Sequence, residues 1–518
     1  MSLTRQSLLL SLGRSSASLA RLLVNLGVAR LFGERLEIAA EYQNVWLVFN
    51  STYMLFIFSL PSVLFYFHPR LDEAGRRYLM SLVHQILLSL GVVYGALLWL
   101  GAPWLRDFYH MSPDAVGHLR VFALYSFAMV GSAAMESTFN LLGRFKLLAV
   151  WMSVESALFL LLALGPLVAG AQPQLFQGPA ALLGALWPTL SLEAASIRAV
   201  CWLLSGMALL KWAVFQLVLA ARHPDMAWHP VKFVGARVKP LLGYALPITA
   251  TTLVAYLAMY MDKNIVAAWF TDKAVYAKFQ AGALEVPFVS VLVGSVSVVM
   301  LPHLSRLQHE GKLAEMADLL AEGVEKVAWL VFPIFTLLMV LADPLYVSFW
   351  GPAYAESALP FRLYLLLFPM RLMFYGQVLN NLGLQRWVLG TAAGDLLLNF
   401  VLAIILVRFH WAGPALATVI ATLAEVVVFW HLLRRGLGQP LARILVPARL
   451  WRIARYSLVA GLAALAGRLA GRGALESILL GGTLHGLTFG ALAWRAGLGE
   501  RVMGEWRRRA AARKERTR

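Results

Sequence analysis

Three arginines lie inside an otherwise apolar stretch near the start of the chain, residues 8–33: Arg14, Arg21 and Arg30. A guanidinium group stays charged in proteins, and its forked donors match the oxygens of a phosphate. If a helix begins near Leu8, Arg21 lies about 20 Å along it, near the middle of a hydrocarbon core of about 30 Å. An arginine at that depth faces a protein interior or a wet cavity. The stretch therefore predicts a cationic, phosphate-binding helix.

The same expected helix carries a polar stripe. Its members are Arg14, Ser18, Arg21 and Asn25. They are three or four residues apart, which places them on one side of an α-helix. We predict that this stripe lines a substrate-binding cavity. The alternatives are that Arg14 extends to the aqueous surface and that Arg21 pairs with an acidic residue on a neighbouring helix.

Polar residues inside later apolar stretches are further candidates. For the cavity they are Asp262, Lys263, Arg371 and Tyr375. For binding a coupling ion, H⁺ or Na⁺, they are Glu136, Glu155, Glu285 and Asp395. The alternative for the acids is that they neutralise Arg21, Arg371 or Lys211 and hold helices together, as intramembrane charges often do.

The composition predicts an all-α polytopic membrane protein. Of 518 residues, 60% are hydrophobic and only 14% are charged, which excludes a soluble globular protein and a disordered chain. A single cysteine, Cys201, excludes a disulfide framework and a cysteine-based metal site. No phosphate-binding loop or zinc-binding motif is present in the sequence. We therefore expect no cofactor and no enzyme activity.

Apolar runs between charged or Pro/Gly-rich breaks predict about fourteen transmembrane helices. They are 8–32, 42–67, 78–101, 117–142, 147–170, 196–221, 241–270, 275–301, 325–349, 357–383, 388–409, 412–434, 451–470 and 475–497. Alternate breaks are rich in Arg and Lys, which predicts that both termini are cytoplasmic. We expect the basic tail to contact anionic lipid rather than nucleic acid. Residues 312–326 are expected to form an amphipathic helix on the cytoplasmic surface.

The chain repeats itself at a separation of about 240 residues. The stretch from Asn140 to Arg144 resembles Asn381 to Arg386, and Glu155 corresponds to Asp395. Two six-helix lobes that enter the membrane in the same direction imply a pseudo-two-fold axis along the membrane normal and a cavity between the lobes. The expected divisions are a first lobe at 1–222, a cytoplasmic linker at 223–240, a second lobe at 241–435, two additional helices at 436–498 and a basic tail at 499–518.

Several short stretches resemble the multidrug/oligosaccharidyl-lipid/polysaccharide flippase superfamily. They are Ala29-Arg30-Leu31-Phe32-Gly33, residues 261–267 (MDKNIVA), Tyr276, Glu285-Val286-Pro287 and residues 299–306 (VMLPHLSR). The resemblance covers about residues 1–435 and implies two six-helix lobes that alternate access to a central cavity. Fourteen helices and a cationic first helix resemble the members of this superfamily that flip polyprenyl-diphosphate-linked saccharides more than the members that extrude drugs.

The resemblance implies a monomeric flippase of a lipid-linked oligosaccharide in the bacterial inner membrane, serving polysaccharide export. Its partners would be that substrate, membrane lipids and a coupling ion. Two alternatives stay open: a flippase for lipid II, the peptidoglycan precursor, and a cation-coupled multidrug antiporter. The antiporter alternative predicts resistance to cationic dyes when the protein is overexpressed. A third class, a membrane-embedded scaffolding protein, predicts no transport.

Overall fold

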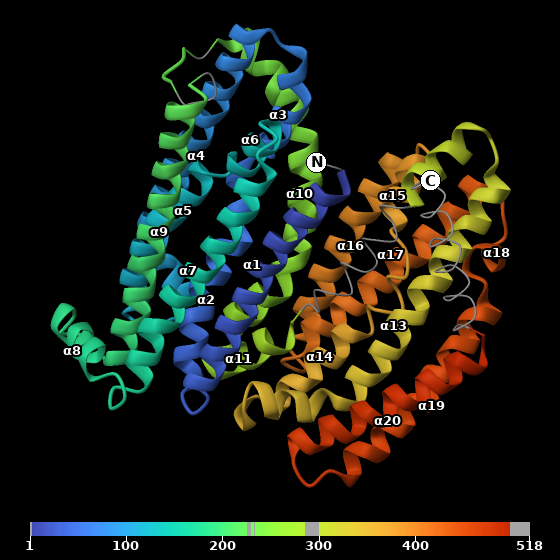
Figure 1. Cartoon of the computed structure of the whole chain (residues 1–518). Coiled ribbons are helices and arrows are strands. Elements are labelled where there is room, and N and C mark those ends of the chain that lie inside the picture. The colour runs from blue at the N-terminus through green and yellow to red at the C-terminus, as the bar shows by residue number, and fades with distance from the viewer. Residues whose placement is uncertain (1–2, 225–228, 233, 285–299, 498–518) are drawn as a thin grey trace, which may run out of the picture. The chain divides into compact units, whose positions relative to one another are not determined.

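The computed structural model describes residues 3–224, 229–232, 234–284 and 300–497 (Figure 1). These residues form α-helices joined by short turns, with no β-strand among them. They divide into two compact units: unit 1 holds residues 1–281 and 407–414, and unit 2 holds 282–406 and 415–518. The chain is therefore an all-α protein, as its composition predicts. The division into six-helix lobes stays a prediction.

Unit 1 contains twelve helical segments among its described residues. They are α1 (Leu3–Leu31), α2 (Leu36–Ile57), α3 (Leu60–Phe67), η1 (His68–Arg70), α4 (Glu73–Phe108), α5 (Ala115–Gly131), α6 (Met135–Leu141), α7 (Phe145–Ala171), α8 (Gln177–Leu186), α9 (Leu192–Arg222), α10 (Gly235–Trp269) and α11 (Lys273–Gly282). Helix α1 packs along α7, and α5 packs between α4 and α9 (Figure 1).

After residues 282–284, the description of unit 2 resumes in a helical segment at residue 300 and continues through nine labelled elements. They are α13 (Leu313–Phe349), η2 (Pro352–Ser357), α14 (Ala358–Leu365), α15 (Tyr375–Asn381), α16 (Gln385–Leu406), α17 (Gly413–Leu437), α18 (Leu441–Leu445), α19 (Pro447–Ala470) and α20 (Ala474–Arg495). Helices α19 and α20 form an antiparallel pair that packs on α13 (Figure 1).

Eleven helical stretches of the described chain are long and apolar enough to cross a membrane. Helix α1 is not among them, although its 29 residues exceed the length of a span. Two other expected helices differ from the prediction. The one at 357–383 is interrupted between α14 and α15, and the one at 275–301 is described as α11 and then only from residue 300. The chain is thus a multi-pass membrane protein, and the count of fourteen stays a prediction.

The expected helix at 42–67 is also interrupted. Helix α2 ends at Ile57, and Phe58 and Ser59 have φ angles of 51° and 47° before α3 begins. Pro61 occupies the first turn of α3 and has no N–H for the carbonyl of Ile57. A proline at that position favours a new helix start over continuation of the old helix.

The expected amphipathic helix at 312–326 is instead the first part of α13, which continues without a break to Phe349. Its apolar face is buried, as the spacing of its apolar residues predicts: Met316, Leu320 and Val324 are at most 3% exposed. They belong to the core of unit 2, together with side chains of α15 and α17. The segment is therefore a packed part of unit 2.

Glycines allow close contacts between helices in both units. A Cβ atom on Gly27 of α1 would lie 2.5 Å from Leu164 Cδ2 of α7. A Cβ atom on Gly467 of α19 would lie 2.7 Å from the backbone nitrogen of Gly481 in α20. Small residues at such contacts let membrane helices pack closely in the absence of a strong hydrophobic driving force.

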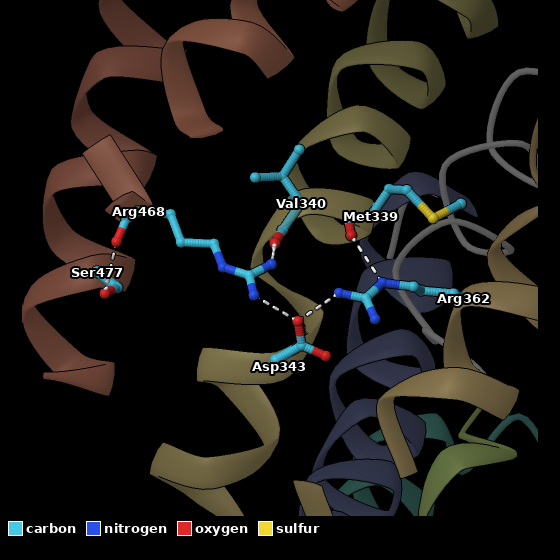
Figure 2. A network of polar contacts seen from close by, with 6 residues as sticks. All are labelled: Met339, Val340, Asp343, Arg362, Arg468 and Ser477. Atoms are coloured by element: carbon cyan, nitrogen blue, oxygen red, sulfur yellow. Dashed lines mark hydrogen bonds and ion pairs between the residues drawn. The ribbon is translucent and has the colours of Figure 1, made fainter. Parts of the chain in front are cut away.

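Helices α13, α14 and α19 meet in a polar network in unit 2 (Figure 2). Asp343 Oδ2 accepts one hydrogen bond from Arg362 Nη2 and one from Arg468 Nη2, both of 2.6 Å. Arg468 Nη1 also donates to the carbonyl oxygen of Val340 at 2.7 Å. Pro344 lies four residues after Val340 and has no N–H, so this carbonyl lacks its usual helical partner. Arg468 therefore satisfies the carbonyl that Pro344 leaves free.

We predict that Arg468→Met lowers the free energy of unfolding by about 1–3 kcal/mol, because the carbonyl of Val340 loses its donor in an apolar environment. Thermal unfolding of the purified protein in detergent would measure the change. The control is Arg455→Met on the same helix, since Arg455 is exposed and makes no hydrogen bond or ion pair with the described residues. Equal stability of the two variants would contradict the assignment.

Candidate substrate cavity

Unit 1 encloses a cavity of about 490 Å³. Its walls come from α1, α2, α5, α6, α7, α9, α10 and α11. The charged residues among its described lining are Arg21, Glu136, Glu155 and Lys211. A volume of this size accommodates part of a large polar substrate, within the usual range for ligand pockets.

Arg21 is the cation that α1 contributes to this cavity. Its side chain is exposed to the space and makes no hydrogen bond or ion pair with the described residues. It acts electrostatically on the phenol groups of Tyr125 and Tyr256, which also line the cavity. Arg21 is therefore available to bind an anionic group. The alternative interpretation from the sequence, that Arg21 pairs with an acidic residue on a neighbouring helix, finds no such pair among the described residues.

The rest of the predicted stripe on α1 divides in two. Asn25 lines the cavity with Arg21. Arg14 forms an ion pair with Glu136 of α6. Ser18 donates a hydrogen bond to the carbonyl of Arg14 on its own helix and does not line the cavity. The structure therefore brings Arg21 and Asn25 together, one turn apart.

Both cavity carboxylates have cationic partners. Glu136 accepts from Arg14, and Glu155 of α7 accepts a hydrogen bond of 2.7 Å from Lys211 Nζ of α9. The Lys211 and Glu155 side chains are 15% and 24% exposed, so their attraction is only partly screened by water. These two pairs cancel in charge. Among the charged residues of the described lining, Arg21 is therefore the one left without an opposite charge in contact.

The remaining wall is rich in aromatic rings and amides. The phenols of Tyr53, Tyr125, Tyr256 and Tyr260 and the amides of Asn25, Gln43, Asn50 and Gln280 are among the lining groups. The Oε1 atoms of Gln43 and Gln280 are buried and have no hydrogen-bond partner among the described residues. Buried amide oxygens are normally hydrogen-bonded. These two atoms are therefore positioned to accept from water or from hydroxyl groups of a ligand.

The stripe on α2 was not predicted from the sequence, although its spacing contains the signal. Gln43, Trp46, Asn50 and Tyr53 are separated by three or four residues, and all four line the cavity. The same spacing in α1 identified the arginine stripe. Charge drew attention to α1, whereas neutral polar and aromatic residues on α2 fit interfacial or packing positions equally well.

Two predicted cavity residues on α10 lie elsewhere. Asp262 and Lys263 are 3% and 7% exposed and do not line the cavity. Lys263 Nζ donates to the carbonyl of Met259 at 3.2 Å and lies 5.3 Å from the ring centre of Tyr260. Their neighbours on the same helix, Tyr256 and Tyr260, line the cavity instead.

The predicted residues of the second lobe lie in unit 2. Tyr375 is packed in the apolar core, where its hydroxyl accepts from Trp430 Nε1 at 3.2 Å. Asp395 Oδ1 is buried without a hydrogen-bond partner among the described residues, and Arg371 and Glu425 lie within electrostatic reach of Asp395. Arg371 makes no ion pair with either acid in the described structure. Glu285 lies outside the described residues.

This architecture defines the class of the molecule: an α-helical multi-pass membrane protein with the fold of the multidrug/oligosaccharidyl-lipid/polysaccharide flippase superfamily. Residues 181–359 match the family described as "Polysaccharide biosynthesis protein". The superfamily resemblance predicted from the sequence is thereby confirmed. No curated protein matches the sequence.

Three solved structures document the shared fold. A lipid II flippase MurJ in an inward closed conformation has a TM-score of 0.68 and 16% identity, covering 94% of this chain and 99% of its own. An inward-facing multidrug resistance MATE family transporter has a TM-score of 0.61 and 14% identity, with coverage of 82% and 94%. A superfamily transporter from Pyrococcus furiosus, titled for the reverse polarity of its binding pocket, has a TM-score of 0.54 and 14% identity, with coverage of 85% and 95%.

We predict that Lys211→Met lowers the free energy of unfolding by about 1–3 kcal/mol, because it leaves the Glu155 carboxylate with no cation in a partly dehydrated site. The double variant Lys211→Met/Glu155→Gln should recover most of the loss, since it removes the uncompensated charge. Thermal unfolding of wild type, both single variants and the double variant measures the coupling. Additive effects of the two substitutions would show that the contact contributes little.

Proposed function

We propose that the chain is a flippase that carries a polyprenyl-diphosphate-linked oligosaccharide across the bacterial inner membrane for polysaccharide export. The observation that supports this most is the uncompensated guanidinium of Arg21 in a cavity of phenols and amides. A diphosphate needs a cation with matching donors. A glycan needs hydrogen-bonding groups and flat rings to stack on. The match of residues 181–359 to a polysaccharide biosynthesis family supports the same cargo.

The arrangement of charges favours an anionic cargo over a cationic drug. A free carboxylate would strengthen the binding of an organic cation, but Glu136 and Glu155 are each paired with a basic side chain. Arg21 is the charged lining residue that has no ion-pair partner among the described residues. This supports a phosphate-bearing cargo for this chain and disfavours the antiporter alternative.

Arg21 and Asn25 lie one turn apart on α1, so the diphosphate would bind at Arg21 with Asn25 beside it. The glycan would occupy the aromatic and amide wall, while the polyprenyl tail stays in lipid. In this proposal both termini lie in the cytoplasm. In this proposal Asp395 in unit 2 remains a candidate for a coupling ion, because its Oδ1 has no hydrogen-bond partner in the described structure. The cavity would alternate its access between the two sides of the membrane.

We predict that Arg21→Ala reduces export of the surface saccharide by about 10- to 100-fold, the loss expected when a charge-assisted contact to phosphate is removed. Arg21→Lys should retain an intermediate level, since it keeps the charge without the fork. The measurement is surface saccharide and lipid-linked intermediate in cells whose gene copy is replaced by each variant. The control is Arg455→Ala, with the membrane abundance of every variant checked by immunoblot.

Export at the wild-type level by Arg21→Ala at normal abundance would contradict the proposal. Deleting the gene separates the possible cargoes. Loss of surface saccharide in viable cells supports the oligosaccharide, whereas lysis with accumulated lipid II supports the peptidoglycan precursor. Increased sensitivity to cationic dyes alone would support a drug antiporter.

A further inference from the structure

A buried carboxylate–imidazole pair lies outside the cavity lining and is not used by the proposed function. Glu41 at the start of α2 is 7% exposed, and His118 at the start of α5 is fully buried. His118 Nδ1 lies 3.0 Å from Glu41 Oε1. His118 Nε2 lies 3.1 Å from the carbonyl oxygen of Ala194 in α9. One imidazole ring therefore bridges three helices of unit 1.

The two contacts of His118 raise the question of how many protons the Glu41–His118 pair holds. Both ring nitrogens face oxygen atoms, but a neutral imidazole has only one N–H to donate. The second contact needs one more proton. It can sit on the ring, giving an imidazolium beside a carboxylate, or on Glu41, whose hydroxyl then donates to Nδ1. Both forms hold one proton more than a neutral histidine beside an ionised glutamate, so hydrogen bonds at both ring nitrogens need one proton shared by Glu41 and His118.

Other charged and titratable groups face this pair from the surrounding helices. Lys273 of α11 acts electrostatically on Glu41, and the Ser112 hydroxyl group also lies near it. On α9, Cys201 lies within reach of both Glu41 and Arg198. Lys273 supplies positive potential that stabilises the ionised carboxylate when the shared proton is absent. Lys273 therefore favours the state of the pair in which Glu41 is ionised.

The pair is connected to the cavity through the backbone of α2. Tyr42 and Gln43 follow Glu41 directly, and both line the cavity. If the shared proton leaves, an ionised oxygen of Glu41 faces the lone pair of Nδ1, and the attraction becomes a repulsion. The contact of α2 with α5 and α9 then weakens at the wall of the cavity.

We propose that Glu41 and His118 together form a proton-binding site, and that the loss or gain of its proton changes the packing of the cavity wall. The ligand is H⁺ itself. Its use as the coupling ion of transport rests on the proposed function, but proton binding does not. The cavity carboxylates Glu136 and Glu155 are less suited to this role, because each is held by a basic partner.

The test is nuclear magnetic resonance of the full-length protein in lipid nanodiscs, with labelled histidine ring nitrogens and glutamate carboxyl carbons, over about pH 5 to 9. The chain has 11 histidines, so His118→Gln identifies the signal. We expect Glu41 and His118 to lose one shared proton in a single step. In Glu41→Gln, whose amide can donate to Nδ1, that step should be lost while thermal stability changes little.

The matched control is Glu193→Gln, which removes a carboxylate of α9 that is ion-paired with Arg35. It should leave the titration of His118 unchanged. A His118–Glu41 pair that keeps its proton over the whole range, or never holds one, would overturn the proposal, as would a wild-type titration in Glu41→Gln. The titration needs no cargo, so a wrong assignment of the cargo would leave its result intact. If the protein also exports the oligosaccharide, Glu41→Gln should make the rate of that export independent of external pH.

Discussion

The cavity of unit 1 depends on the high free energy of an uncompensated charge in an apolar environment. Three of the four charged residues in its described lining have an opposite charge in contact: Glu136 with Arg14, and Glu155 with Lys211. Arg21 does not. Such a residue is stable only where water or a ligand can reach it. The phenols and amides of α2, α5, α10 and α11 line the same cavity and supply the polar surface that such a residue needs.

The helical organisation could be predicted from the sequence because a helix that crosses the membrane must be apolar and long enough to span the hydrocarbon core. Alternating apolar and basic segments placed most helices within a few residues of their structural limits. The breaks were missed at two kinds of position. Pro61 lies within an apolar run that continues to Phe67, and the segment between α14 and α15 is apolar apart from Arg371. Hydropathy responds to side-chain polarity and not to backbone geometry.

The candidate site could be predicted only where charge marked it. Arg21, Asn25, Glu136 and Glu155 were found because polar residues at helical spacing contrast with an apolar background. The Glu41–His118 pair was missed because its partners are 77 positions apart and each stands near the end of an expected helix. Nothing local distinguishes them from residues at the membrane surface. Contacts between distant segments require the tertiary packing of α2, α5 and α9.

The arginine that caps the free carbonyl of Val340 has a consequence for synthesis. Arg468 is translated 125 residues after Asp343, and α13 also contacts α18 to α20 through Asp318–Arg443, Glu325–Arg449 and Thr336–His485. As the chain enters the membrane, α13 emerges with the carbonyl of Val340 unsatisfied. Unit 2 can reach its final packing only after the last two helices have left the ribosome. A nascent chain halted before α19 therefore lacks Arg468 for the carbonyl of Val340 and Arg449 for the carboxylate of Glu325.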